Sequence, residues 1–250
     1  MVFLDDSTFT VIQRQSHYPV YRDKLMDIDR KRFRGLGEDN LRLFITHGTK
    51  YCLDARLPTV RDTAYVMYMM SMIGSYFFED ARYLHIHRIL QDYAADNPAR
   101  FNRVSRVFSE FMSRYAGENG ERFRTALTVY RDRVESLPDT VPHEEIVRIW
   151  ARCVGIENPR NVEALQRVFP DHARHAARYL GVSSEDGERI CLSLSLWLGT
   201  GFYKDPLYPW IRDIPSKEIS ERARTTALMK YTKKRLDHQL NALRSEPGDV

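Results

Sequence analysis

The sequence matches itself when it is shifted by 125 residues, which is half of its length. Segment 74–89 then falls on segment 199–214, and six of the sixteen aligned positions are identical. The identical pairs are Gly74/Gly199, Phe77/Phe202, Asp80/Asp205, Tyr83/Tyr208, Ile86/Ile211 and Ile89/Ile214. A self-match at a fixed spacing is typical of stacked structural repeats. We therefore predict two related halves, residues 1–125 and 126–250, packed as one globular unit.

The repeated unit reads as a capped helix that ends in an aromatic turn. Thr59 and Ser184 stand just before the two apolar segments, where a side-chain oxygen can cap a helix. Glycine then allows the chain to leave the helix with positive φ, and an aspartate can cap the helix that follows. The positions assigned to these structural roles are Gly74 and Asp80 in one half and Gly199 and Asp205 in the other.

Helix signals dominate the chain, and strand signals are nearly absent. No alternating Val/Ile/Thr run and no Asn-Gly hairpin is found. Proline near a helix start marks three further helices, at Asn97-Pro98, Val141-Pro142 and Asn158-Pro159. Segments 64–78 and 190–203 are almost wholly apolar, as expected for central helices. The prediction is an all-α helical bundle of about ten helices made of two pseudo-repeated halves.

Composition excludes several classes of protein. The formal net charge of +4 is small for a chain with 38 basic and 34 acidic residues, so no nucleic-acid partner is expected. Each apolar segment spans about fifteen residues, short of the roughly 20 that a membrane-spanning helix needs. Three scattered cysteines and an N-terminus without a signal-peptide pattern lead us to expect a cytoplasmic protein without a membrane span.

The N-terminal 95 residues resemble a known helical family. The similarity runs through the Leu57-Pro-Thr-Val-Arg-Asp62 segment, the apolar helix, Gly74 and the aromatic-acidic turn, with an echo in 155–215. This is an uncharacterised family encoded in type VI secretion loci, close to spike (VgrG or PAAR) and effector-adaptor genes. The resemblance implies an accessory role in loading or chaperoning a secreted effector, and it brings no catalytic residues.

Aromatic residues in the two turns are the candidate partner-binding residues, because aromatic side chains dominate interface hot spots. An alternative role is to close the core behind each apolar helix. The candidates are Tyr76, Phe77, Phe78, Phe202, Tyr203, Tyr208 and Trp210.

No motif indicates an enzyme, a cofactor or a metal site. His85 and His87 point to different faces of a helix. His172 and His175 share a face with Asp171 nearby, but no third strong ligand is close in sequence. We therefore predict no catalytic residues, no cofactor and no metal.

These observations favour a non-catalytic protein-binding scaffold. The family resemblance makes a type VI secretion effector chaperone, co-chaperone or adaptor the first hypothesis, with a secreted effector, an adaptor or a spike component as partner. One alternative is an immunity protein that neutralises a cytoplasmic toxin. Another is an enzyme with an unrecognised helical site that uses His172 and His175.

Overall fold

The computed structural model is all-α, as predicted. It describes residues 6–57, 59–134, 141–212, 214 and 220–244. Within these ranges the chain forms eleven α-helices and two short 3₁₀ helices, and it forms no strand. The prediction of an all-α fold with about ten helices is therefore confirmed.

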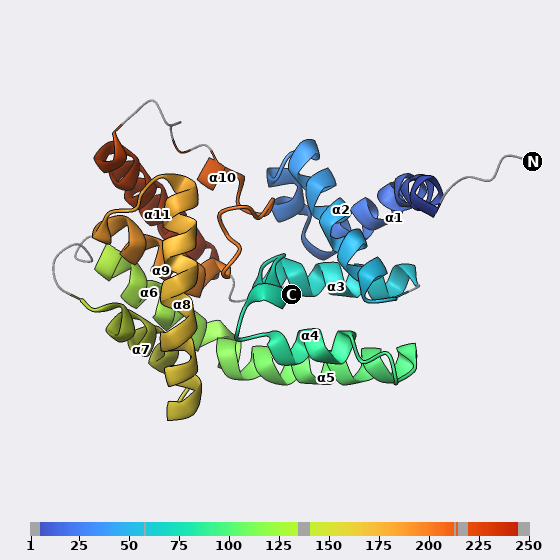
Figure 1. Ribbon diagram of the computed structural model, residues 1–250, viewed down its shortest axis with the longest axis horizontal. Coiled ribbons are helices and arrows are strands. Elements are labelled where there is room, and N and C mark those ends of the chain that lie inside the picture. The colour runs from blue at the N-terminus through green and yellow to red at the C-terminus, as the bar shows by residue number, and fades with distance from the viewer. Residues whose placement is uncertain (1–5, 58, 135–140, 213, 215–219, 245–250) are drawn as a thin grey trace, which may run out of the picture.

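Helices α1 to α5 gather on one side of the molecule, and α6 to α9 with α11 gather on the other (Figure 1). The first group and its 3₁₀ turn are α1 (Asp6–Gly35), α2 (Glu38–Asp54), α3 (Val60–Ile73), η1 (Phe77–Glu79), α4 (Leu84–Leu90) and α5 (Asn97–Ala116). The second 3₁₀ turn and the remaining helices are η2 (Glu118–Gly120), α6 (Glu121–Val134), α7 (His143–Cys153), α8 (Pro159–Leu180), α9 (Glu185–Leu198), α10 (Pro209–Arg212) and α11 (Glu221–Arg244).

The central helices α3 and α9 begin as the sequence predicts. Thr59 Oγ1 accepts a hydrogen bond from Asp62 N at 3.0 Å, and Ser184 Oγ accepts one from Gly187 N at 3.4 Å. Each side chain therefore satisfies a backbone donor that the first helical turn leaves free. Both helices are mostly buried, which accounts for their apolar sequences.

Helix α1 breaks near its C-terminal end and not at its proline. Pro19 lies inside the helix. The non-helical backbone is at Asp29, with φ −152° and ψ 83°. The Asp29 Oδ1 atom accepts a hydrogen bond from Arg32 N at 2.9 Å, so this side chain starts the last helical turns in the way an N-cap does.

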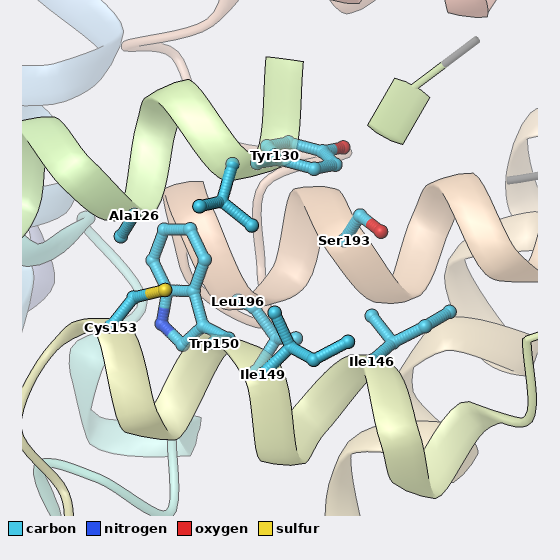
Figure 2. A pocket seen from close by; sticks show the side chains of 9 residues that line it. Ala126, Tyr130, Ile146, Ile149, Trp150, Cys153, Ser193 and Leu196 are labelled. Carbon is cyan, nitrogen blue, oxygen red and sulfur yellow. The ribbon is translucent and has the colours of Figure 1, made fainter. Parts of the chain in front are cut away.

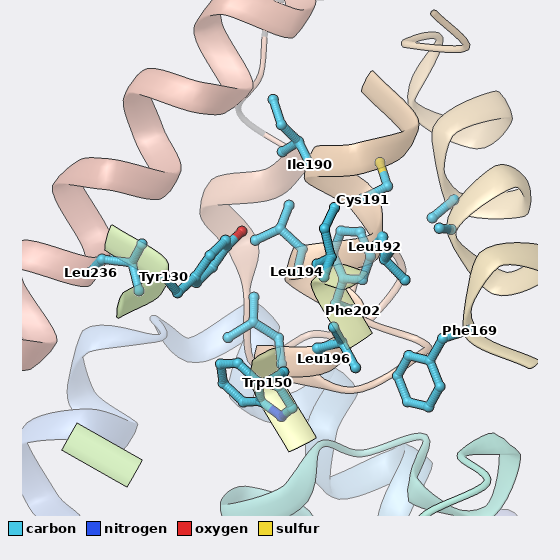
Figure 3. Close-up of a cluster of buried hydrophobic side chains, with 14 of the residues drawn as sticks. Tyr130, Trp150, Phe169, Ile190, Cys191, Leu192, Leu194, Leu196, Phe202 and Leu236 are labelled. Carbon is cyan, nitrogen blue, oxygen red and sulfur yellow. The ribbon is translucent and has the colours of Figure 1, made fainter. Parts of the chain in front are cut away.

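Two hydrophobic clusters form the core. The buried members of the first lie between Tyr21 and Phe108, with Leu207 added from the other half of the chain. Those of the second lie between Tyr115 and Leu240. Figure 3 shows the second cluster, in which the side chains of α9 are surrounded by residues of the neighbouring helices. The two clusters correspond broadly to the two halves, and the predicted boundary at residue 125 stays a prediction.

In the ranges that the structure describes, no helix is both long and apolar enough to cross a bilayer.

Replacement of the glycine that ends α3 is predicted to destabilise the fold. Gly74 has φ 95° and ψ 144°, and a Cβ atom there would lie 2.8 Å from the carbonyl oxygen of Leu198. Gly74→Ala should lower the free energy of unfolding by at least about 1–3 kcal/mol, the cost of this backbone conformation for a residue with a side chain. Urea denaturation measures the change. Gly35→Ala is the control, because its Cβ would meet nothing within 4 Å and its φ is not positive. An equal effect of both substitutions would contradict the prediction.

Candidate functional site

Two buried aspartates join the halves by exchanging hydrogen bonds. Asp205 Oδ2 accepts from Ser75 N at 2.8 Å, and Asp80 Oδ2 accepts from Thr200 N at 3.2 Å. Both carboxylates are at least 97% buried. Each half therefore supplies the acceptor for the backbone just after the central helix of the other half.

The expected role of these aspartates as caps of the following helices needs correction. Asp80 Oδ1 accepts from Arg82 N at 3.0 Å, and Asp205 Oδ1 accepts from Leu207 N at 2.9 Å. These hydrogen bonds stabilise the turn that follows each central helix. Helix α4, which begins after Tyr83, has no side-chain cap. The second oxygen of each carboxylate accepts a hydrogen bond from the opposite half, which a local sequence pattern does not reveal.

Arg82 neutralises Asp80 inside the core. Its Nη2 atom lies 2.7 Å from Asp80 Oδ2, and its side chain is 2% exposed. The same guanidinium donates to the carbonyl oxygens of Leu196 at 2.5 Å and Ser195 at 3.1 Å, near the C-terminal end of α9. Burial alone would lower the pKa of this group, but the Asp80 carboxylate holds it above its ordinary value. The ion pair lies within the first half, and the Arg82 guanidinium links it to the last turn of α9.

Asp205 has a different environment. Position 207, which corresponds to Arg82 under the 125-residue shift, is a leucine that packs into the first cluster. Among the described residues no cation forms an ion pair with Asp205, and burial raises the pKa of its carboxyl. His47 lies nearby, with Nε2 3.0 Å from the Ser75 carbonyl oxygen, and burial lowers the pKa of its ring.

Other features also recur at the 125-residue spacing. Gly199 ends α9 with φ 100° and ψ 156°, close to the angles of Gly74. Arg56 and Gly181, which align under the same shift, have φ 53° and 67°. The origin of the two halves from one repeated unit stays a prediction that these contacts support.

The predicted aromatic residues lie mostly in the core. Half-buried members are Tyr76, Phe78 and Tyr208, and buried members are Phe77, Phe202, Tyr203 and Trp210. The alternative role, closing the core behind each apolar helix, therefore accounts for the four buried rings. Only the three half-buried rings have exposed edges that could contact a partner.

The accessible rings join a larger group that bridges the two halves, which we call the aromatic seam. It consists of His47, Tyr76, Phe78, Tyr179, Tyr203 and Lys204. The ring centroids of His47 and Tyr76 are 4.4 Å apart, and those of Tyr179 and Tyr203 are 4.9 Å apart. Lys204 Nζ sits 4.1 Å from the centroid of Tyr76 and connects the two sets.

Contacts across the halves fix the position of Tyr76. A Cβ atom on Gly201 would lie 2.4 Å from Tyr76 Cβ, so the tyrosine packs directly on the glycine backbone. Lys204 Nζ also lies 3.0 Å from both carboxylate oxygens of Glu79. An ammonium over an aromatic face is attracted by the ring as well as by the nearby carboxylate. The seam is therefore a surface made by both halves.

Sequence reasoning missed three members of the seam. His47 and Tyr179 come from α2 and α8, far in sequence from the aromatic turns. Tyr179 is 62% exposed, the largest value among the exposed large hydrophobic residues. The sequence could have indicated Tyr179 through helical spacing, because it follows His175 by four residues and so lies on the same face of α8.

The histidines considered above as metal ligands contact other protein groups. His87 Nδ1 lies 2.9 Å from the Tyr51 hydroxyl, and Asp171 pairs with Arg174. Over the ranges that the structure describes, no three His, Cys, Asp or Glu side chains are grouped as a metal site. His175 instead packs its ring against Tyr203, with centroids 5.6 Å apart.

A small, partly open hollow lies between α6, α7 and α9 (Figure 2). Its lining residues are Ala126, Val129, Tyr130, Ile146, Ile149, Trp150, Cys153, Ser193 and Leu196. The Ser193 hydroxyl already donates to the Arg189 carbonyl oxygen at 3.0 Å. The lining is mainly apolar and aromatic, so this hollow offers a packing surface rather than acid–base groups.

Comparison of the chain with known protein families, curated proteins and solved structures found no significant match.

The buried ion pair gives a stability prediction. Asp80→Asn leaves the Arg82 guanidinium buried without a counter-charge, which should lower the free energy of unfolding by about 3–5 kcal/mol. Asp132→Asn removes an exposed partner of Arg131 and should change the free energy of unfolding much less, because exposed ion pairs contribute little to stability. Chemical denaturation of both variants measures the difference. Similar small effects of the two substitutions would show that the buried pair is not required.

The unneutralised carboxylate gives a prediction about pH. Because burial raises the pKa of Asp205, the folded protein binds a proton where the unfolded chain has already released it. The contribution of Asp205 to the free energy of unfolding should therefore fall as pH rises above about 4, and then level off. Asp205→Asn lacks this titration. The difference in unfolding free energy, wild type minus variant, should decrease over that range in urea denaturation, and a difference that rises with pH would contradict the assignment.

Proposed function

We propose that the protein is a non-catalytic scaffold that binds a protein partner through the aromatic seam. The observation that carries this proposal is the bridge of Lys204 over Tyr76, which holds exposed and half-exposed rings from both halves in one surface. Rigid aromatic side chains contribute large contact areas at low entropic cost, which is why they are frequent among interface hot spots.

The chemistry at the seam supports binding rather than turnover. Glu79, the carboxylate closest to Lys204, is already paired with it. The His47 ring contacts the Ser75 carbonyl oxygen and the Tyr76 ring. These groups hold one another in place, and the surface they form combines aromatic rings with a paired lysine and glutamate. Aromatic residues are enriched in protein interfaces.

The family resemblance of the N-terminal region suggests which kind of partner the protein binds. We propose that the partner is a secreted effector, an adaptor or a spike component of a type VI secretion system. The protein would then act in the cytoplasm as a chaperone, co-chaperone or adaptor before secretion.

Co-expression with effector and adaptor proteins encoded beside the gene tests this proposal. We expect one of them to form a stoichiometric complex in size-exclusion chromatography with light scattering. Tyr179→Ala combined with Tyr76→Ala should then weaken binding by about 30-fold or more in calorimetry, as expected for hot-spot residues. The melting temperature should change little for Tyr179→Ala alone, because that ring is 62% exposed.

Two controls separate recognition from folding. Tyr231→Ala removes a ring that is 38% exposed on α11, outside the seam, and should leave binding intact. Phe77→Ala removes a ring that is 1% exposed and should cost about 3–5 kcal/mol of stability. Failure of every neighbouring protein to bind, or equal loss of binding with Tyr231→Ala, would contradict the proposal.

A further inference from the structure

We propose that the N-terminal half carries a second binding surface, an open face between α1, α3 and α5 that fits an amphipathic α-helix of a protein partner. This surface is distinct from the aromatic seam. The inference comes from a comparison of the two halves, because the C-terminal half shows what covers the corresponding face.

Helix α6 covers that face in the C-terminal half. The ring of Tyr130 packs against Trp150 of α7 and Trp197 of α9, with centroid distances of 6.4 and 6.2 Å. The next residue, Arg131, forms an ion pair of 2.9 Å with Asp237 of α11. One side of α6 therefore closes the groove formed by three helices.

The same three helices exist in the N-terminal half. A shift of 125 residues maps α9 onto α3 with identical bounds, α7 onto residues 18–28 of α1, and most of α11 onto α5. The α5 and α11 helices also dock alike. Arg100 of α5 donates to the carbonyl oxygen of Arg56 at 3.1 Å, and Arg224 of α11 donates to that of Gly181 at 2.9 Å. Those two acceptors are 125 positions apart.

Helix α6 has no separate counterpart among the described helices. Under the same shift it falls on positions up to residue 9, and residues 6–9 belong to the continuous helix α1. The face that α6 would cover should therefore be exposed in the N-terminal half.

The exposure of the apolar residues agrees with this expectation. Ile28 of α1 and Met72 of α3 are each 46% exposed, and Tyr68 is half-buried. The counterpart of Tyr68 is Ser193, which is 2% exposed in the covered half. Met112 of α5, also half-buried, completes the set. We call Ile28, Tyr68, Met72 and Met112 the open face.

The residues of the open face specify the chemistry of the helix that fits it. Its central position, equivalent to Tyr130, takes an aromatic or large aliphatic side chain against Tyr68 and Met72. Under the 125-residue shift, Met112 corresponds to Asp237, the ion-pair partner of Arg131. The partner helix should therefore carry an apolar side chain at the position equivalent to Arg131. Lys24 is exposed beside this face, and no described carboxylate pairs with it, so an acidic residue on the partner helix would complement it.

A labelled helical peptide tests the proposal on the intact protein. The probe is a fluorescein-labelled, hydrocarbon-stapled peptide with the sequence of α6 and the substitution R131L. We expect saturable binding in fluorescence anisotropy, weakened at least about 10-fold by Met72→Glu and by Ile28→Glu. The unsubstituted α6 peptide should bind more weakly, because its arginine would face Met112.

Matched controls decide the interpretation. Leu43→Glu changes a residue of α2 that is 51% exposed and lies outside the open face, so it should leave peptide binding intact. Tyr179→Ala should also have no effect, because it alters only the seam. Circular dichroism should show that the glutamate variants keep their helix content, since the replaced side chains are exposed.

Three outcomes would overturn the proposal. The first is the absence of saturable binding by the R131L peptide. The second is equal loss of binding with Leu43→Glu or Tyr179→Ala, which would place the peptide elsewhere. The third is a marked gain in affinity when residues 1–5 are deleted, which would identify the chain's own N-terminus as the occupant. Neither the first nor the third outcome would affect the seam, so the two proposals fail separately.

Discussion

The structure depends on two buried carboxylates that each accept a hydrogen bond from the opposite half. A carboxylate out of contact with water needs hydrogen-bond donors, a cation, or both. Asp80 finds a cation in Arg82 and a donor in Thr200, whereas Asp205 relies on backbone N–H groups that include Ser75. Because one donor to each carboxylate comes from the opposite half, neither turn can reach its observed state without the other half in place.

This exchange also determines the position of the candidate binding surface. Tyr76 follows Ser75 directly, and Lys204 precedes Asp205 directly. The two residues that meet in the seam are therefore chain neighbours of the two residues that exchange a hydrogen bond. A partner bound at the seam would contact both halves at the point where they are joined.

The sequence predicted more of the fold than of the site. Caps such as Thr59 and Ser184 and stops such as Gly74 act through contacts within a few residues, so their patterns are visible in the chain. The partners of Asp80 and Asp205 lie 120 and 130 residues away, and a local pattern assigned these side chains to nearby helices instead. The aromatic residues stay candidates for partner binding, because spacing alone does not separate a ring in the core from one at its edge.

Hydrogen exchange of two backbone amides tests the central claim most directly. The amides of Ser75 and Thr200 donate to carboxylates of the opposite half, so both should exchange only on global unfolding. Asp205→Asn should accelerate exchange at Ser75 with a much smaller effect at Thr200. Fast exchange of both amides in the wild-type protein, or acceleration confined to residues near position 205, would contradict the account.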